Sequence, residues 1–482
     1  MWGHSFILHS KKILLFAVIV ITTTYVMNYL YLDDTDEFSR YMLHELYEQD
    51  ENIDRLYLGS SHVFCDVNPA VLDDVNGDNN FDLATGNQQL IASYYLLKEA
   101  DKKHDIKQVY LDMYYVCTTA GMGNLHDYDA IPHSWIVLNE MKPSLNKFSY
   151  MINLSEPRYY YLTFLPFIRY KEQLFQPGYV KDIVARKQEK TWKNREYYHI
   201  RKMENGEFIM KSGEKGFMVN FGTPEQGGFY DRASGVPLKE NPVAEESIEY
   251  LVKIVDYCKE NDIALTWITC PVSDYQLVGI DTYDYYVEQM RDLSMQYGIP
   301  WYDFNLCKKE YLDLSSKQYW SDKGHLNSVG AELFTRFMGE LLQAEENGDR
   351  TYADCFHNSY EDKISAAREE IFGLEIVDSD EYEKCLLDVE PERQGEYAIY
   401  KIRPVTNAAP RDVEIHVCLV TREEDEEWDY GRRSYADGDE LEIIYDGNDG
   451  YVILGAGEHG YLYVEAKLRG AAETKNWAEV EY

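Results

Sequence analysis

Apolar positions follow two different patterns along the chain. Between residues 50 and 345, short apolar runs alternate with segments whose apolar residues recur at helical spacing. The expected strands lie at residues 53–61, 79–89, 106–116, 263–271 and 299–304. The expected helices lie near 68–74 and at 90–104, 243–262, 283–298 and 328–343. Such alternation with short connections predicts an α/β domain with a parallel sheet covered by helices, whose site lies at the carboxyl ends of the strands.

A polar and aromatic stretch, about residues 118–241, interrupts this rhythm. Within it, residues 159–175 are predicted to be helical and residues 205–222 to form a hairpin. After a linker at 346–375, period-two apolar runs are separated by Gly, Asn, Asp and Pro, and the first run lies at 384–391. This second pattern predicts a small antiparallel β-sandwich over residues 376–482.

The N-terminal segment carries twenty residues without a charge, from Ile13 to Leu32. A helix of that length crosses a hydrocarbon core of about 30 Å. Lys11 and Lys12 precede the run and acidic residues follow it, which predicts a cytoplasmic stub and single-pass anchor at residues 1–32. The segment 33–49 is then a linker, and the domain at 50–345 lies outside the cell membrane. A cleaved signal peptide is the alternative, although the run is long for one and no small-x-small site follows it.

Composition and charge exclude some classes of partner. With 47 Lys plus Arg against 85 Asp plus Glu, the formal charge of −38 repels polyanions, so no nucleic-acid partner is expected. The eight cysteines show neither a CxxC pair nor Cys/His spacing typical of a ligand set, and neither a metal nor a cofactor is predicted. The 43 tyrosines are compatible with stacking on sugars, but a count alone identifies no ligand.

The first candidate motif follows the first expected strand, at Gly59, Ser60 and Ser61. A strand that enters a tight turn and then a helix presents a side chain above the edge of the sheet. The backbone N–H groups of the helix start point to the same place, as an oxyanion requires. The alternative is that the serines only cap the helix, and this motif alone leaves both open.

The second candidate motif precedes the last expected helix of the α/β domain. Asp322 and His325 are three positions apart in a polar loop. This spacing can bring the carboxylate beside Nδ1 of the imidazole, so that Nε2 serves as a base. An Asp that caps a turn and a surface His are the alternative for an isolated pair of this kind.

Together the two motifs resemble the SGNH/GDSL hydrolase family, over about residues 52–343. Leu58-Gly59-Ser60-Ser61 matches its first block, with Ser60 where Asp is usual, and Asp322-x-x-His325-Leu326-Asn327 matches its last block. A serine at the Asp position is similar to the exported branch that includes the lipoteichoic acid D-alanylation protein and alginate O-acetyltransferase accessory proteins. The resemblance implies a three-layer flavodoxin-like domain and a Ser61–His325–Asp322 triad that works through a covalent acyl-enzyme.

The oxyanion hole of the family matches this chain in part. Gly86 follows the second expected strand, where the resemblance implies a glycine whose N–H binds the oxyanion. The third expected strand ends in YLDMYYV, without the asparagine of the family's Gly-x-Asn-Asp block. Asn87 is the nearest amide and either replaces that donor or holds a turn. A missing donor costs about 10²-fold or more in rate.

The resemblance implies a membrane-anchored serine acyltransferase or esterase. Its substrates would be O-acyl groups, with O-acetyl as the expected group, on a cell-surface or secreted polysaccharide. The same branch implies a membrane-bound O-acyltransferase as the partner that supplies the acyl group. The alternative is a non-catalytic glycan-binding or assembly protein of the cell envelope, which the absent asparagine and the tyrosine-rich insertion favour. Transfer and hydrolysis use the same triad, so the sequence does not separate them.

Overall fold

The computed structural model describes most of the 482-residue chain. Described are residues 2–34, 38–119, 131–173, 175–189, 201–202, 208–222, 242–273, 276–277, 283–314, 317–349, 351–363 and 366, and the C-terminal strands at 392–394, 397–402, 413–421, 439–440, 444–446, 449–455, 459–468 and 473–481. The predicted run at 384–391 lies outside these residues.

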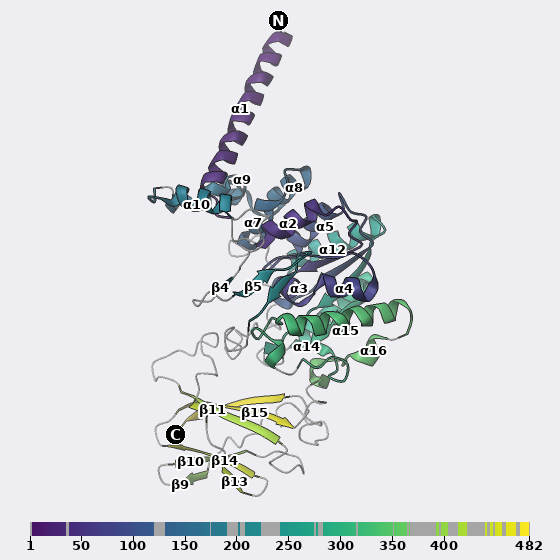
Figure 1. The fold of residues 1–482 in the computed structure, drawn as a ribbon, viewed down its shortest axis with the longest axis vertical. Helices are drawn as coiled ribbons and strands as arrows, with labels where there is room; N and C mark the ends of the chain where they lie inside the picture. Colours follow the sequence, from purple (N-terminus) through teal and green to yellow (C-terminus); the bar gives the residue numbers. More distant parts are fainter. Residues whose placement is uncertain are drawn as a thin grey trace. The chain divides into compact units, whose positions relative to one another are not determined.

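A five-stranded parallel sheet forms the α/β region (Figure 1). Its order is β2 (Asn80–Ala84), β1 (Arg55–Gly59), β3 (Gln108–Asp112), β7 (Ala264–Thr269) and β8 (Trp301–Asp303). This is the strand order of flavodoxin-like folds, in which ligands bind beyond the carboxyl ends of the strands. The predicted α/β fold is therefore confirmed, and each of the five expected strands is present.

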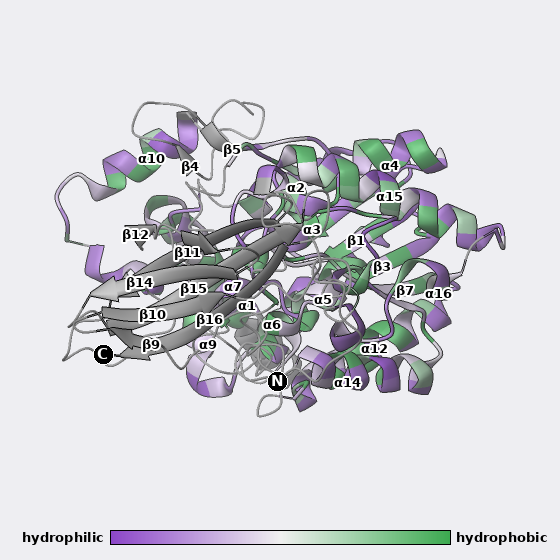
Figure 2. Cartoon of the chain, turned by 90° about the horizontal axis from the view of Figure 1, so that it is seen from below, coloured by the Kyte–Doolittle hydropathy of each residue, from purple (hydrophilic) through white to green (hydrophobic). Residues whose placement is uncertain are grey.

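The connecting helices follow the predicted amphipathic segments. They are α3 (Ser61–Asp66), α4 (Pro69–Asn76), α5 (Leu90–Ala100), α12 (Glu245–Glu260), α14 (Tyr283–Tyr297) and α15 (Ser328–Glu346). Figure 2 shows α12, α14 and α15 with both hydrophobic and hydrophilic residues, as expected for helices with one buried face. Local signals set their ends: α4 begins after Asn68, whose side chain accepts a hydrogen bond from the N–H of Ala70, and ends at Gly77 with φ of 77°.

The chain forms two compact units. The first comprises residues 1–64, 78–219 and 243–265, and the second comprises 65–77, 220–242 and 266–482. The predicted limits of the hydrolase-like domain, its linkers and the sandwich stay a prediction.

The first unit contains β1, β2 and β3, whose buried residues are matched in parallel register. Helix α2 (Phe38–Glu48), within the segment predicted as a linker, packs with Met42 and Leu43 fully buried. The short helix α6 (Tyr115–Thr118) leads into the insertion. The insertion contributes α7 (Ile131–Glu140), α8 (Leu145–Asn153), η1 (Pro157–Tyr159), α9 (Tyr160–Phe164), η2 (Pro166–Gln173) and α10 (Tyr179–Glu189). A small sheet follows, of β4 (Arg201–Lys202), β5 (Phe208–Ser212) and β6 (Met218–Asn220).

The predicted apolar helix at the N-terminus is present as α1 (Trp2–Tyr31). Its segment Lys11–Tyr31 is long and apolar enough to cross a membrane, and none of it is buried inside the protein. A soluble core helix of this composition would be buried, so the exposure agrees with the predicted anchor without fixing its topology.

The second unit contains β8, α4, α14, α15 and α16 (Tyr352–Cys355), followed by two antiparallel sheets. One sheet has the order β13 (Ile444–Asp446), β14 (Asp449–Gly455), β10 (Tyr397–Ile402) and β9 (Glu392–Gln394). The other has the order β12 (Asp439–Glu440), β11 (Val413–Thr421), β15 (His459–Leu468) and β16 (Glu473–Glu481). The antiparallel pairing agrees with the predicted period-two strands, whereas β9 and β16 were not expected from the sequence.

Candidate active site

The turn after β1 depends on a glycine. A Cβ atom on Gly59 would lie 2.5 Å from Cβ of Asp112 and 2.6 Å from Cγ2 of Val63. Only a residue without a side chain therefore lets β1 end this close to the end of β3 and the start of α3. The close approach explains why glycine precedes the two serines.

Ser60 caps helix α3. Its carbonyl oxygen accepts from the N–H of Val63 at 3.1 Å, and its Oγ accepts from the N–H of His62 at 3.4 Å. The Ser60 hydroxyl donates to Oδ2 of Asp112 at 3.2 Å, and both residues are buried. The capping alternative thus describes Ser60, whereas Ser61 is the half-buried first residue of α3.

His62 packs locally beside the predicted nucleophile. Its ring centroid lies 3.9 Å from that of Tyr114, and Nδ1 lies 3.1 Å from Oγ of Ser60. The side chains of Ser60, His62 and Asp112 thus form a buried polar group at the ends of β1 and β3. The sequence indicated only ordinary strand-end polarity at Asp112, because a contact between residues 52 positions apart leaves no local pattern.

Gly86 and Asn87 form the turn after β2. The N–H of Thr85 donates to the carbonyl of Gly59 at 3.2 Å, so the turns after β1 and β2 are adjacent at the same edge of the sheet. The N–H of Gln88 closes the turn on the carbonyl of Thr85 at 3.2 Å, and Asn87 adopts φ of 50°. Asn tolerates this left-handed conformation better than most residues, so Asn87 holds the turn. The oxyanion roles of Gly86 and Asn87 stay predictions.

His133 also contacts this turn, and the sequence did not identify it. It lies in the first turn of α7, and its ring lies close enough to the backbone of Gly86 to be influenced by it. Burial lowers the pKa of His133, while the backbone of Gly86 acts in the opposite direction. The aromatic insertion thus supplies a residue to the turn where an oxyanion donor is predicted.

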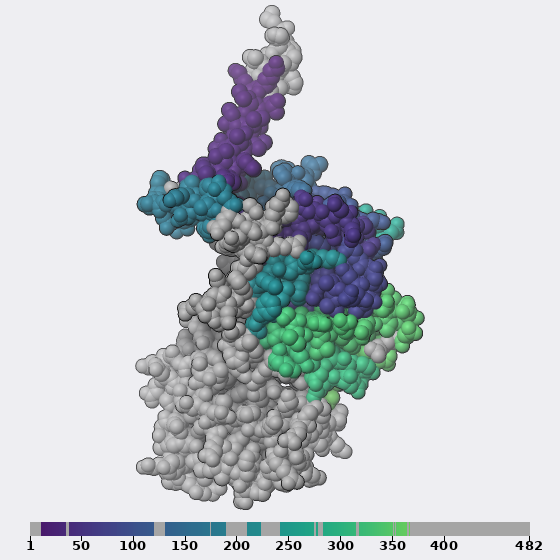
Figure 3. Space-filling model, viewed as in Figure 1, coloured from purple at the N-terminus to yellow at the C-terminus, as the bar shows by residue number. Residues whose placement is uncertain are grey.

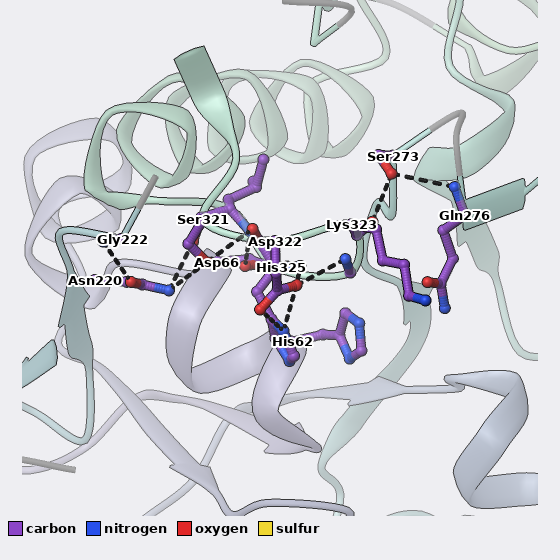
Figure 4. A network of polar contacts seen from close by, with 12 residues as sticks. His62, Asp66, Asn220, Gly222, Ser273, Gln276, Ser321, Asp322, Lys323 and His325 are labelled. Carbon is purple, nitrogen blue, oxygen red and sulfur yellow. Dashed lines mark hydrogen bonds and ion pairs between the residues drawn. The ribbon is translucent and has the colours of Figure 1, made fainter. Parts of the chain in front are cut away.

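In the second unit, Asp322 and His325 form a hydrogen-bonded pair (Figure 4). Both carboxylate oxygens of Asp322 lie 3.0 Å from Nδ1 of His325. Oδ1 of Asp322 also accepts from the N–H groups of Gly324 and His325, each at 2.8 Å. Burial alone would raise the pKa of Asp322, but the charge on His325 and these hydrogen bonds hold that pKa below its usual value. An ionised carboxylate only accepts, so Nδ1 carries a proton and, in the neutral ring, Nε2 is free of one.

Backbone and side-chain hydrogen bonds fix the loop that carries this pair. The N–H of Ser321 donates to the carbonyl of His325 at 2.9 Å. Nδ2 of Asn220, at the end of β6, donates to Oγ of Ser321 at 2.7 Å and to the carbonyl of Leu326 at 3.3 Å (Figure 4). The hydroxyl of Ser273 donates to the carbonyl of Lys323 at 2.6 Å. Such supporting bonds keep a catalytic side chain in one orientation.

Two further residues, Asp66 and Asn327, support this loop. Oδ1 of Asp66, at the end of α3, accepts from the N–H of Leu326 at 3.0 Å. The side chain of Asn327 accepts from the N–H groups of Val329 and Gly330 and so caps α15. The Asn327 of the last motif therefore has a structural role, which the resemblance did not specify.

The predicted site residues lie in both units. Ser61, Gly86 and Asn87 belong to the first, at the carboxyl ends of β1 and β2, whereas Asp322 and His325 belong to the second and are bonded to each other. Among the residues that the structure describes, no group of three or more His, Cys, Asp or Glu side chains could hold a metal ion.

Comparison with known proteins gives few likenesses. No protein-family model matches the chain, and no curated protein matches it. A solved structure of a candidate acylhydrolase from Bacteroides fragilis is 11% identical, covers 64% of this chain and 96% of that chain, and has a TM-score of 0.27. A candidate platelet activating factor from Streptococcus pneumoniae is 10% identical over 67% of this chain and 99% of that chain, with a TM-score of 0.29. A superoxide reductase in the oxidized state is 17% identical over 20% of this chain and 87% of that chain, with a TM-score of 0.14. Likenesses of this size carry no argument about activity, which rests on the residues themselves.

Proposed function

We propose that this protein is a membrane-anchored serine acyltransferase or esterase of the SGNH type. It acts on O-acyl groups, with O-acetyl as the expected group, of a cell-surface or secreted polysaccharide. The observation that carries the proposal is the Asp322–His325 pair, in which both carboxylate oxygens lie 3.0 Å from Nδ1. A carboxylate that fixes the tautomer of an imidazole in a braced loop is the arrangement that a serine nucleophile requires.

The proposed reaction has two acyl-transfer steps. Nε2 of His325 accepts the hydroxyl proton of Ser61 as Oγ attacks the acyl carbon. The donor alkoxide leaves with that proton, and the acyl group stays on Ser61. A hydroxyl of the acceptor, or water, then gives its proton to Nε2 and attacks the acyl-enzyme. Nε2 passes that proton to Oγ as the acyl group leaves, which restores both Ser61 and His325. The backbone N–H groups of Ser61 and Gly86 are the proposed donors to the oxyanion in both steps.

The proposed location of this chemistry follows from α1. With Lys11 and Lys12 on the cytoplasmic side, the rest of the chain lies outside the cell membrane, where polysaccharide hydroxyls are the available acceptors. A membrane-bound O-acyltransferase is the proposed source of the acyl group.

The decisive experiment compares two serines at equivalent helix positions. Ser61 is the first residue of α3 after the cap Ser60, and Ser328 is the first residue of α15 after the cap Asn327; both are half-buried. Full-length protein in detergent should release 4-nitrophenol from 4-nitrophenyl acetate and react with a fluorophosphonate probe. Ser61→Ala should abolish both signals and Ser328→Ala neither. Equal turnover by wild type and Ser61→Ala would overturn the catalytic assignment.

The mass of a candidate glycan incubated with the enzyme and an acetyl donor separates transfer from hydrolysis. A gain of acetyl groups supports transfer, and their loss supports hydrolysis. A glycan-binding role is the second candidate, because the third strand ends without the asparagine of the hydrolase pattern and the insertion is rich in tyrosine. That role predicts glycan binding by a protein whose Ser61 does not react with the fluorophosphonate.

A further inference from the structure

The last turns of α1 are bonded to helices of the insertion. The N–H of Phe167 in η2 donates to Oδ1 of Asn28 at 3.1 Å, and Nζ of Lys187 in α10 donates to the Asn28 carbonyl at 3.4 Å. The hydroxyl of Tyr179 in α10 donates to the carbonyl of Tyr31 at 3.1 Å. A helix end leaves its last carbonyls without intrahelical partners, and Tyr179 supplies a donor to one of them, that of Tyr31. The insertion helices are therefore fixed to the end of α1.

Ion pairs strengthen the same junction. Arg186 lies 2.8 Å from Asp33, and Lys187 lies 3.2 Å from Asp34, with the Lys187 side chain only 7% exposed. Arg40 of α2 also pairs with Asp34, at 3.2 Å. The exit of α1 is thus held by two charged residues of α10 and one of α2. Figure 3 shows α1 extending away from the rest of the first unit, with α10 at its base.

The helices next to this junction expose apolar side chains. Outside α1, nine large hydrophobic residues are exposed among the described residues, and five of them lie between residues 145 and 175. Leu145, Phe148 and Ile152 of α8 are 88%, 52% and 38% exposed and fall on one face of the helix at i, i+3 and i+7. Phe175, which follows η2, is 92% exposed. We call α8, α9, η2, Phe175 and α10 the collar.

Charge and aromatic content set the collar apart from the rest of the chain. Residues 145–189 contain seven Lys or Arg against four Asp or Glu, although the whole chain carries −38. The same segment contains ten Tyr and Phe. Exposed aromatic rings together with basic side chains are typical of the membrane–water interface, where rings sit at headgroup level and cations meet anionic lipid. A basic collar in an acidic chain fits a negatively charged lipid surface.

We propose that the collar lies in the headgroup layer of the bilayer that α1 crosses, and that it prefers anionic lipid. This inference rests on the membrane anchoring proposed above. The 21 residues from Lys11 to Tyr31 span about 31 Å as a helix, which matches a hydrocarbon core of about 30 Å. Asn28 and Tyr31 therefore lie at the boundary of that core, and the residues bonded to them lie at headgroup depth. The first unit is then held flat against the membrane by the collar rather than suspended from a flexible stalk.

Spin labels on the full-length protein in phosphatidylglycerol/phosphatidylcholine vesicles test the depth of the collar. Labels replace Leu145 and Phe175 in the collar, Ile19 in α1, and Met295 as the control, which is 68% exposed and apolar but lies outside the collar. Collision with oxygen, relative to collision with a water-soluble nickel chelate, reports lipid contact. The six cysteines among the described residues are buried, and the signal of the unsubstituted protein is subtracted.

The expected result is deep lipid contact at Ile19, shallow lipid contact at Leu145 and Phe175, and water contact at Met295. Collar labels that behave like Met295 while Ile19 is in lipid would overturn the collar but not the anchor. A water-exposed label at Ile19 would overturn the anchor itself. At position 175, the ratio of label in contact with lipid to label in contact with water should fall about 5-fold in each of two variants, Lys171→Gln and Lys181→Gln. Lys259→Gln in α12 is the matched control and should leave the ratio unchanged; an equal fall would overturn the lipid preference.

Discussion

The substitution Asp322→Asn separates the chemistry of the Asp322–His325 pair from the folding of its loop. In the native protein, Oδ1 of Asp322 accepts from the N–H groups of Gly324 and His325 and also faces Nδ1 of His325. An asparagine of the same shape keeps the two backbone hydrogen bonds through its own Oδ1. Its Nδ2 then replaces Oδ2, which lies 3.0 Å from Nδ1 of His325. Because Nδ2 only donates, it favours an Nδ1 that accepts, and the imidazole proton then moves to Nε2, the atom that should act as the base. The other tautomer keeps only Oδ1 as an acceptor for Nδ1, and Oδ1 already accepts from two backbone N–H groups.

The size of the effect follows from the cost of turning the introduced amide over. Turning it would restore an acceptor for Nδ1, but would aim its NH₂ group at the two backbone N–H donors. Each unsatisfied donor costs about 1–3 kcal/mol, so the active tautomer becomes less favourable by about 2–6 kcal/mol. That range corresponds to a fall in kcat/KM of about 30-fold to 10⁴-fold.

Turnover of 4-nitrophenyl acetate by the full-length protein measures this fall, and thermal unfolding measures the integrity of the loop. Asp322→Asn should unfold within a few degrees of the wild type. Asp322→Ala should lose activity as well, but should also unfold at a lower temperature, because both backbone hydrogen bonds are lost. The smallest expected fall in activity is about 30-fold. An Asp322→Asn protein that keeps more than about a tenth of wild-type activity would therefore refute the assigned tautomer.

Three further substitutions test the supporting structure. Ser60→Asp should destabilise the protein by a few kcal/mol, because two buried carboxylates within about 3 Å cannot both ionise, and adding Asp112→Asn should restore the melting temperature. Gly59→Ala should cost about 1–3 kcal/mol, read as a lower melting temperature, because its Cβ would lie 2.5 Å from Cβ of Asp112. Burial raises the pKa of Asp303 to about 6. Between about pH 4 and pH 6, the native state therefore binds a proton that the unfolded state has lost. The free energy of unfolding falls as the pH rises through this range. Asp303→Asn should remove this fall, and its melting temperature relative to wild type should rise over that window; an unchanged difference would contradict the assignment.

Much of the fold could be predicted because its signals are local. Each observed strand of the parallel sheet lies within an apolar run that was predicted to form it. Helices α12, α14 and α15 likewise coincide with predicted amphipathic segments. Helix α2 was not predicted, since its polar residues obscure the buried Met42 and Leu43 in a segment next to the apolar α1. Strand β16, with the sequence ETKNWAEVE, alternates too few apolar residues to be recognised. Helix α2 depends on partners that are distant in sequence, α7 and β2, whereas β16 pairs with β15, the strand before it.

The candidate site shows the same division. The Asp322–His325 contact was predicted because the partners are three positions apart, and a loop can bring them together. The supports of that loop were not predicted, since Asn220 and Asp66 are 101 and 260 positions away from Ser321 and Leu326. His133 reaches Gly86 from the insertion, and nothing in its neighbourhood indicates that contact. The sequence therefore identified the candidate reacting groups and missed most of what positions them.

The side chains of Ser60 and Asp112 are linked in the turn before Ser61. In the resemblance described above, Ser60 stands where an Asp is usual, and the third strand ends without the expected asparagine. The hydroxyl of Ser60 donates to Oδ2 of Asp112 at 3.2 Å, and both side chains are buried. A buried carboxylate requires donors, which a serine at position 60 provides and an aspartate would not. The buried hydroxyl of Ser60 therefore provides a donor to the carboxyl group of Asp112 in the turn before Ser61.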